Sequence, residues 1–211
     1  MINDKISHRI NLDSDGTLQI AEARASDTGE YTCEVKSNGG NDRRSAMLDV
    51  IELPYAPTSI QATKISTGHD PVINISWTAG FDGNSPIIKY IIQYRFVPEE
   101  GPIPDDTLNW VTVLANISSA QRFVELNGLR SSAAYIFRVS SVNSVGEGQP
   151  SLPSLRVVLP QEPPSAPPMG LVGSARSESE IMIQWQPPSE ESQNGEIIGY
   201  IVRYRLFGYH D

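Results

Sequence analysis

The sequence has little that would allow internal cross-linking or membrane insertion. Cys33 is the only cysteine among 211 residues, so no disulfide can form within the chain. No apolar run approaches the roughly 20 residues that a membrane-spanning helix needs. Residues 1–5 are polar and lack the apolar core of a signal peptide. If the protein is exported and anchored, we therefore expect the signal and the anchor to lie outside this sequence.

Positive charge and catalytic motifs are also scarce. The net charge is −9, and the sequence has no basic stripe that could bind the phosphates of a nucleic acid. His8, His69 and His210 are isolated from one another and from Cys33, so none forms a metal-ligand pair. There is no phosphate-binding loop, no G-x-S-x-G and no H-E-x-x-H. The sequence therefore predicts no enzyme activity, no cofactor or metal, and neither a small-molecule substrate nor a nucleic-acid partner.

Turn residues, in contrast, are abundant. The 16 prolines and 16 glycines suit many short strands joined by turns. Leu18-Gln19-Ile20 alternates apolar and polar residues, as a half-buried strand does. A hairpin loop is predicted over residues 37–42 and a last strand over 47–50. The residues between these features have the order and spacing of strands E and F of an immunoglobulin domain, which they resemble: Ala23, Asp27, Gly29, Tyr31 and Cys33.

The immunoglobulin resemblance gives two of these residues a structural role. Tyr31 would be a core marker and would form a tyrosine corner, in which its hydroxyl bonds to upstream backbone. Cys33 would point inward to bridge a cysteine of strand B. That partner cysteine and the tryptophan of strand C are absent from this chain. We therefore expect residues 1–53 to be the C-terminal part of an immunoglobulin domain, with sheet edges left unpaired.

Residues 53–57 are predicted to be a short, stiff linker, and strands with an alternating pattern continue after it. Residues 73–77 predict a strand whose inward face ends in Trp77. Residues 89–95 predict another strand, with Tyr90 on the inward face and Arg95 on the outward face.

A further strand begins at Tyr135, and an N-x-x-G-x-G turn follows it at residues 143–148. This order of strands resembles a fibronectin type III domain from end to end, so residues 54–160 are predicted to be a complete domain of that kind. Large aromatic side chains dominate the core of such a sandwich. The resemblance therefore predicts three core markers: Trp77, Tyr90 and Tyr135.

The last part of the chain repeats the same pattern. Trp185 ends an alternating stretch as Trp77 does, and residues 200–205 repeat residues 90–95. An internal repeat of this length indicates an array of modules. Residues 161–211 are therefore predicted to be the N-terminal part of a second fibronectin type III domain, with Trp185 in its core. The predicted fold class is all-β, with tandem β-sandwiches joined by stiff, proline-rich linkers.

Three surface features complete the sequence-based expectations. Asn74-Ile75-Ser76 and Asn116-Ile117-Ser118 are N-glycosylation sequons, and both asparagines are expected to face solvent. The loop over residues 96–109 is long, acidic and proline-rich. It is interpreted either as a contact loop or, preferably, as a solvated insertion, because loops tolerate extra length at small cost.

The modules and linkers together match one family more closely. Residues 28–42, with their continuation to Pro54, resemble the last immunoglobulin domain of Sidekick proteins. Residues 81–86 and 160–168 resemble the modules that follow it in that family. Residues 181–188 and 199–205 extend the resemblance over nearly the whole chain, and the loop 96–109 departs from it.

This resemblance implies a non-enzymatic piece of a single-pass plasma-membrane protein that mediates homophilic cell adhesion and synaptic targeting. Self-recognition in that family belongs to the first immunoglobulin domains, which this chain lacks, so the segment is expected to be a neck between recognition head and stalk. Two alternatives stay open: the ectodomain of a receptor phosphatase or kinase, and an intracellular muscle-type scaffold with the same modules. A disulfide at Cys33 in the full-length protein would indicate an extracellular location, and a free thiol a cytosolic one.

Overall fold

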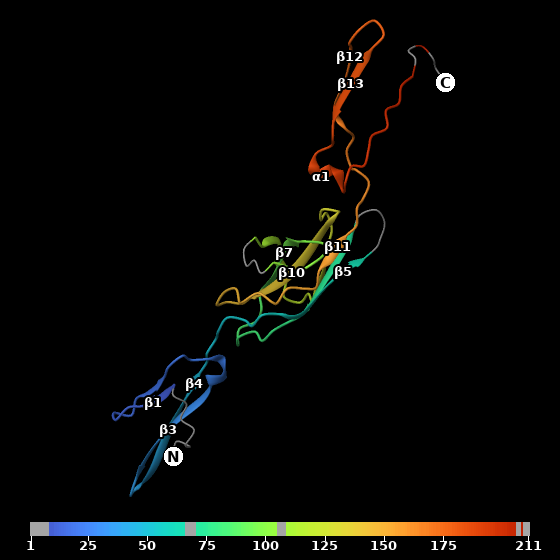
Figure 1. Cartoon of the computed structure of the whole chain (residues 1–211). Coiled ribbons are helices and arrows are strands. Elements are labelled where there is room, and N and C mark those ends of the chain that lie inside the picture. Colours follow the sequence, from blue (N-terminus) through green and yellow to red (C-terminus); the bar gives the residue numbers. More distant parts are fainter. Residues whose placement is uncertain (1–8, 66–70, 105–108, 206–207, 209–211) are drawn as a thin grey trace.

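The computed structural model describes residues 9–65, 71–104, 109–205 and 208. Three groups of strands follow one another along an elongated molecule, from the N-terminal hairpins through a central sandwich to a C-terminal hairpin (Figure 1). The predicted all-β class is confirmed, because the described helices are one short 3-10 turn and one short α-helix. His8, His69 and His210 lie outside the described residues.

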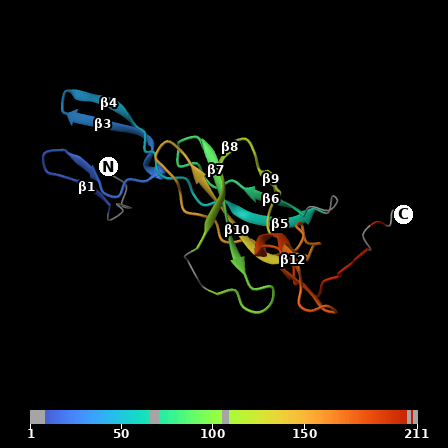
Figure 2. The ribbon, with the colours of Figure 1, turned by 90° about the horizontal axis from the view of Figure 1, so that it is seen from above.

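The first module consists of two separate antiparallel hairpins (Figure 2). Strands β1 (Ile10–Leu12) and β2 (Leu18–Ile20) form one hairpin, and β3 (Gly29–Ser37) and β4 (Gly40–Leu48) form the other. The 3-10 turn η1 (Ala25–Asp27) connects them. The predicted hairpin and its following strand are present, but their bounds differ from the predicted 37–42 and 47–50, because Asn38-Gly39 is a two-residue turn and β4 runs from Gly40 to Leu48. Asn-Gly is a strong signal for such a tight turn.

The interior of this module is open to solvent. Ala25 is the only buried apolar residue in the described stretch 9–50. Tyr31 is half-buried, and its hydroxyl donates to the Asp27 carbonyl at 2.8 Å, which is the geometry of a tyrosine corner. Cys33 is exposed, contrary to the expectation that it points into an interior. The reason is that no second sheet covers β3 and β4 among the residues that the structure describes.

The central module is a sandwich of two antiparallel sheets. One sheet has the order β5 (Thr58–Ile65), β6 (Val72–Thr78) and β9 (Phe123–Leu126). The other has the order β11 (Val157–Leu159), β10 (Ala133–Val142), β7 (Lys89–Val97) and β8 (Val111–Ser118). Alternate residues of β6, β7 and β10 point between the two sheets, as the period-two pattern predicts.

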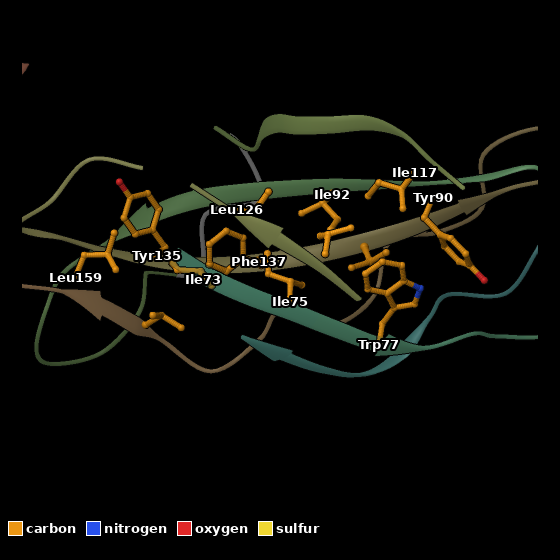
Figure 3. Close-up of a cluster of buried hydrophobic side chains, with 13 residues drawn as sticks. Ile73, Ile75, Trp77, Tyr90, Ile92, Ile117, Leu126, Tyr135, Phe137 and Leu159 are labelled. Carbon is orange, nitrogen blue, oxygen red and sulfur yellow. The ribbon is translucent and has the colours of Figure 1, made fainter. Parts of the chain in front are cut away.

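The side chains between the sheets form one apolar core (Figure 3). Trp77 is 4% exposed and meets Tyr90 edge-to-face, with ring centroids 5.2 Å apart. Tyr135 is 1% exposed and lies beside Leu159 at the other end of the core in Figure 3. Its hydroxyl donates to the Arg130 carbonyl at 2.9 Å, so the ring is buried while its polar end stays bonded.

The outer face of the larger sheet carries a second apolar cluster. Trp110 packs against this cluster, and the centre of its ring lies 5.4 Å from the guanidinium carbon of Arg95 and 4.3 Å from that of Arg138. Arg95 is nevertheless buried, although it lies on the outward face of its strand. Alternation assigned Arg95 correctly to the outer face, but Trp110 covers that face.

The C-terminal module contains β12 (Met169–Ala175), β13 (Ile181–Gln186) and the short helix α1 (Glu190–Gln193). Trp185 is half-buried and meets Tyr200 edge-to-face at 5.4 Å, which repeats the contact between Trp77 and Tyr90. Residues 200–205 do not form the predicted strand. A strand needs a hydrogen-bonded neighbour, and none of the described residues pairs with this stretch.

Candidate functional site

The region with the densest polar contacts between modules is the joint between the first module and the central sandwich. Within the described part of the chain, no cluster of three histidine, cysteine or carboxylate side chains could hold a metal ion. No described helix is long and apolar enough to cross a membrane. Trp77, Tyr90 and Tyr135 lie in the core, so they form no surface site. The joint is therefore the candidate functional site.

The linker pairs with a loop of the central sandwich. The backbone N–H of Glu52 donates to the Gly83 carbonyl, and that of Tyr55 donates to the Phe81 carbonyl, both at 2.9 Å. The rings of Tyr55 and Phe81 meet edge-to-face at 5.4 Å. Pro54 is buried. The linker therefore behaves as part of the sandwich, because its backbone bonds are made to the sandwich instead of to water.

Three glycines allow the linker to approach this closely. A Cβ atom at Gly80 would lie 2.6 Å from the Tyr55 carbonyl oxygen. A Cβ atom at Gly83 or Gly148 would overlap the carbonyl of Glu52 or Pro54, respectively. Gly83 also has a φ of +74°, which a residue with a side chain adopts only with strain. Larger residues at these three positions would displace the linker.

Asn143 joins the linker to two loops of the sandwich. Its side-chain amide donates to the Glu52 carbonyl at 2.7 Å and to the Asp82 carbonyl at 2.9 Å. Its side-chain oxygen accepts from the backbone N–H groups of Val145 and Gly146. The residue is only 3% exposed, and both amide protons have acceptors. A buried polar side chain with all its bonds made fixes the geometry around it.

Asn84 makes the direct contact between the two modules. It occupies the left-handed region, with a φ of 57°, next to Gly83. Its side-chain amide lies 3.0 Å from the Ala25 carbonyl, 3.1 Å from the Val50 carbonyl and 3.1 Å from the Thr28 hydroxyl. One side chain of the central module thus reaches both η1 and the end of the first module.

The turn η1 is itself held firmly. Arg9 makes two side-chain bonds of 3.0 Å to the Asp27 carboxylate. These bonds, together with the backbone N–H of Arg24, lower the pKa of Asp27 to about 2. The backbone N–H of Ala25 donates to the Glu52 carboxylate at 3.2 Å. The acceptor of Asn84 is therefore on a fixed turn, and the contact joins two ordered elements.

The second linker repeats part of this arrangement. Glu162 donates its backbone N–H to the Asn194 carbonyl, and Ser165 donates to the Ser192 carbonyl, both at 2.9 Å. Asn194, like Asn84, has a left-handed backbone, and its side-chain amide donates to the Pro163 carbonyl at 3.0 Å. The pairing of a linker with the loop after the second strand thus occurs in both fibronectin-like modules.

Sequence reasoning missed the residues that make the joint. The predicted turn at 143–148 contains Asn143, and the stretch 81–86 contains Asn84, but neither motif reveals which backbone groups these side chains reach. The available signal was an asparagine in a glycine-containing turn, directly after Gly83 in one turn and three positions before Gly146 in the other, since turn asparagines often bond to nearby backbone groups.

The remaining predicted surface features lie elsewhere on the central module. Asn116 is exposed near the end of β8. Asn74 lies on the face of β6 opposite Ile73 and Ile75, as expected, but it is half-buried there and not fully exposed to solvent. The described part of the loop 96–109 is fixed by two arginines. Arg95 donates to the Pro104 carbonyl at 3.0 Å, and Arg156 donates to the carbonyls of Glu99 and Gly101. Residues 105–108 lie outside the described residues.

Comparison with known proteins agrees with this architecture. The immunoglobulin I-set domain family matches residues 2–50, and the fibronectin type III domain family matches residues 55–156. A crystal structure of the chicken CNTN1 FN1–FN3 domains has a TM-score of 0.51 and 29% identity, and the similarity covers 67% of this chain and 44% of that one.

Similarity along the sequence is higher still. Protein sidekick of Drosophila melanogaster is 56% identical over 209 residues, which is 97% of this chain and 9% of that protein. Protein sidekick-1 of Gallus gallus is 43% identical over 208 residues, which is 99% of this chain and 9% of that protein. The chain thus spans about a tenth of the length of these relatives. With this order of modules and this identity over nearly its whole length, the chain belongs to the Sidekick family.

Proposed function

We propose that this chain is a non-enzymatic segment of an extracellular adhesion protein, in which it is a semi-rigid neck between a recognition head and a stalk. The observation that carries the proposal is the joint at Asn84 and Asn143, where both modules and the linker share one hydrogen-bond network. A joint of this kind limits bending between modules. The distance from the head to the membrane would then be fixed by the number of modules.

Homophilic binding is assigned to domains outside this segment, as the family resemblance implies. Residues 54–160 are proposed as the unit that folds independently, with partial modules over 1–53 and 161–211. The compact apolar core of the central sandwich supports this division, because a domain needs such a core to fold cooperatively. Limited proteolysis should leave a fragment near residues 55–160. Survival of the entire chain as one resistant unit would contradict the division.

Joint rigidity is tested by small-angle X-ray scattering of the chain. Asn84→Asp removes the amide donor while keeping the side-chain shape, and Asn38→Asp makes the same charge change at an exposed hairpin turn. We expect Asn84→Asp to broaden the distribution of the radius of gyration of the chain. Asn38→Asp should leave this distribution unchanged. Equal distributions for both variants and the unaltered chain would refute a fixed joint.

The assignment of binding to other domains is tested by coating beads with the chain. Beads that carry only this segment are expected to stay dispersed, since a neck does not recognise itself. Aggregation of these beads would place a homophilic surface in the segment and overturn the proposal. Mapping Cys33 in the complete gene product tests the extracellular location, where a disulfide is expected.

A further inference from the structure

The two sequons lie in different structural environments. Asn74 is in the middle strand of its sheet, opposite Thr63 of β5 and Glu125 of β9. It is half-buried, and its side-chain oxygen is a buried atom without a hydrogen-bond partner. Asn116 is exposed and lies in β8, an outer strand of the larger sheet. A bulky carbohydrate is therefore compatible with the folded surface at Asn116 and poorly compatible with it at Asn74.

A β-bulge places Asn116 outside the regular ladder. Tyr90 pairs with Ile117, and Ile92 pairs with Leu114. Between these two pairs, β7 has one residue and β8 has two, of which Asn116 is the second. An extra residue of this kind bends the strand and redirects its side chains. The bulge occurs at the acceptor residue of an Asn-Ile-Ser sequon.

The surface beside Asn116 is an open edge of the sandwich. Strand β8 ends one sheet and strand β9 ends the other, and neither has a further partner among the described strands. A shallow groove between them is lined by Asn116, Gln121 and Phe123. Phe123 is 57% exposed. An unpaired edge with an exposed aromatic ring favours pairing with other chains unless it is covered.

We propose that Asn116 carries an N-linked glycan whose first N-acetylglucosamine covers this groove and packs on the ring of Phe123. The Asn116 side-chain nitrogen forms a bond to the anomeric carbon of the sugar, the bond from that carbon to the pyrophosphate oxygen of a lipid-linked oligosaccharide donor breaks, and the amide loses one proton. The apolar C–H face of the sugar ring is complementary to an exposed aromatic face. The glycan would thereby protect the open edge.

This inference rests on the proposed extracellular location, because the donor is available only in the secretory pathway. The first experiment therefore supplies an export signal to the chain and expresses it in eukaryotic cells, so that attachment is tested apart from the natural location. Ser118→Ala and Ser76→Ala are matched variants, because each removes one sequon without altering its asparagine. The readout is the mass of the secreted protein, with peptide mapping after enzymatic release of the glycan.

We expect a glycan at Asn116 that is lost in Ser118→Ala and retained in Ser76→Ala. A glycan at Asn74 alone, or none at Asn116, would overturn the proposal. If a variant is not secreted, translation into microsomes gives the same readout from the shift in electrophoretic mobility. A free Cys33 in the complete gene product, together with a glycan at Asn116 in this experiment, would contradict the extracellular proposal but not the acceptor assignment.

The second experiment tests the contact with Phe123. One enzyme trims the glycan to its first N-acetylglucosamine, and another removes it completely and leaves aspartate, so Asn116→Asp is the control for the charge change. We expect the single-sugar form to scatter less light on concentration than the sugar-free form and Asn116→Asp. Phe123→Ser should abolish this difference. Equal scattering by the single-sugar and sugar-free forms would show that the first sugar does not cover the edge.

Discussion

Replacement of Asn143 by alanine should destabilise the central module and release its linker. The substitution removes the two hydrogen bonds that the Asn143 amide donates to the carbonyls of Glu52 and Asp82, at 2.7 and 2.9 Å. It also removes the two that the side-chain oxygen accepts from the N–H groups of Val145 and Gly146, at 2.9 and 3.2 Å. Each buried hydrogen bond contributes about 1 kcal/mol net, and a carbonyl left buried without a partner costs about 1–3 kcal/mol. Because the N–H groups of the loop can regain water, we expect a total loss of about 2–4 kcal/mol.

Urea unfolding of bacterially produced, glycan-free protein measures this loss, with tryptophan fluorescence as the signal. Asn143→Asp keeps the acceptor and loses both donors, so it should also cost at least about 2 kcal/mol. Asn116→Ala is the control, because the residue is exposed and its removal should change stability by less than about 0.5 kcal/mol. A cost for Asn143→Ala no greater than that of the control would refute the role of Asn143 in the joint.

Three further predictions concern other groups. Gly148→Ala should lower the free energy of unfolding by about 1–3 kcal/mol in calorimetry, because its Cβ would overlap the Pro54 carbonyl. Gly173→Ala is the control: its Cβ would meet open space, so the free energy of unfolding should change by less than about 0.5 kcal/mol. Arg9→Gln should raise the pKa of Asp27 from about 2 toward 3.8, as measured by NMR titration. In the unaltered chain the lowered pKa of Asp27 stabilises the fold above pH 3.8, and this contribution is lost as the pH falls toward 2. Burial raises the pKa of Tyr135 to about 12, so its stabilising contribution is present below pH 10 and lost as the pH rises toward 12; absorbance titration should show a late phase that is absent from Tyr135→Phe.

The position of the core could be predicted from sequence because it depends on local chain geometry. Successive side chains of a strand point to opposite faces, so alternation alone places Trp77, Tyr90 and Tyr135 inward. The structure puts all three at 4% exposure or less. The tyrosine corner at Tyr31 could be anticipated for a similar reason, since its hydroxyl reaches a carbonyl only four residues upstream.

Burial on the outer faces could not be predicted in this way. Whether an outward residue meets solvent depends on what lies over it, and Trp110 covers Arg95 from fifteen positions further along the chain. Cys33 shows the opposite case: it was expected to be buried but is exposed, because an inward position is buried only if a second sheet faces it. Residues 200–205 have strand-forming sequence, but strand formation also needs a neighbour.

By itself, the sequence determined the class of fold, the order of the modules and the family, since these follow from alternation, spacing and similarity along the chain. Only the tertiary structure decided where the modules are joined. Asn84 reaches Ala25 across 59 residues, and Asn143 reaches Glu52 across 91. Such contacts bring together groups that no local pattern connects, because each depends on how the complete loops and linker fold around one another.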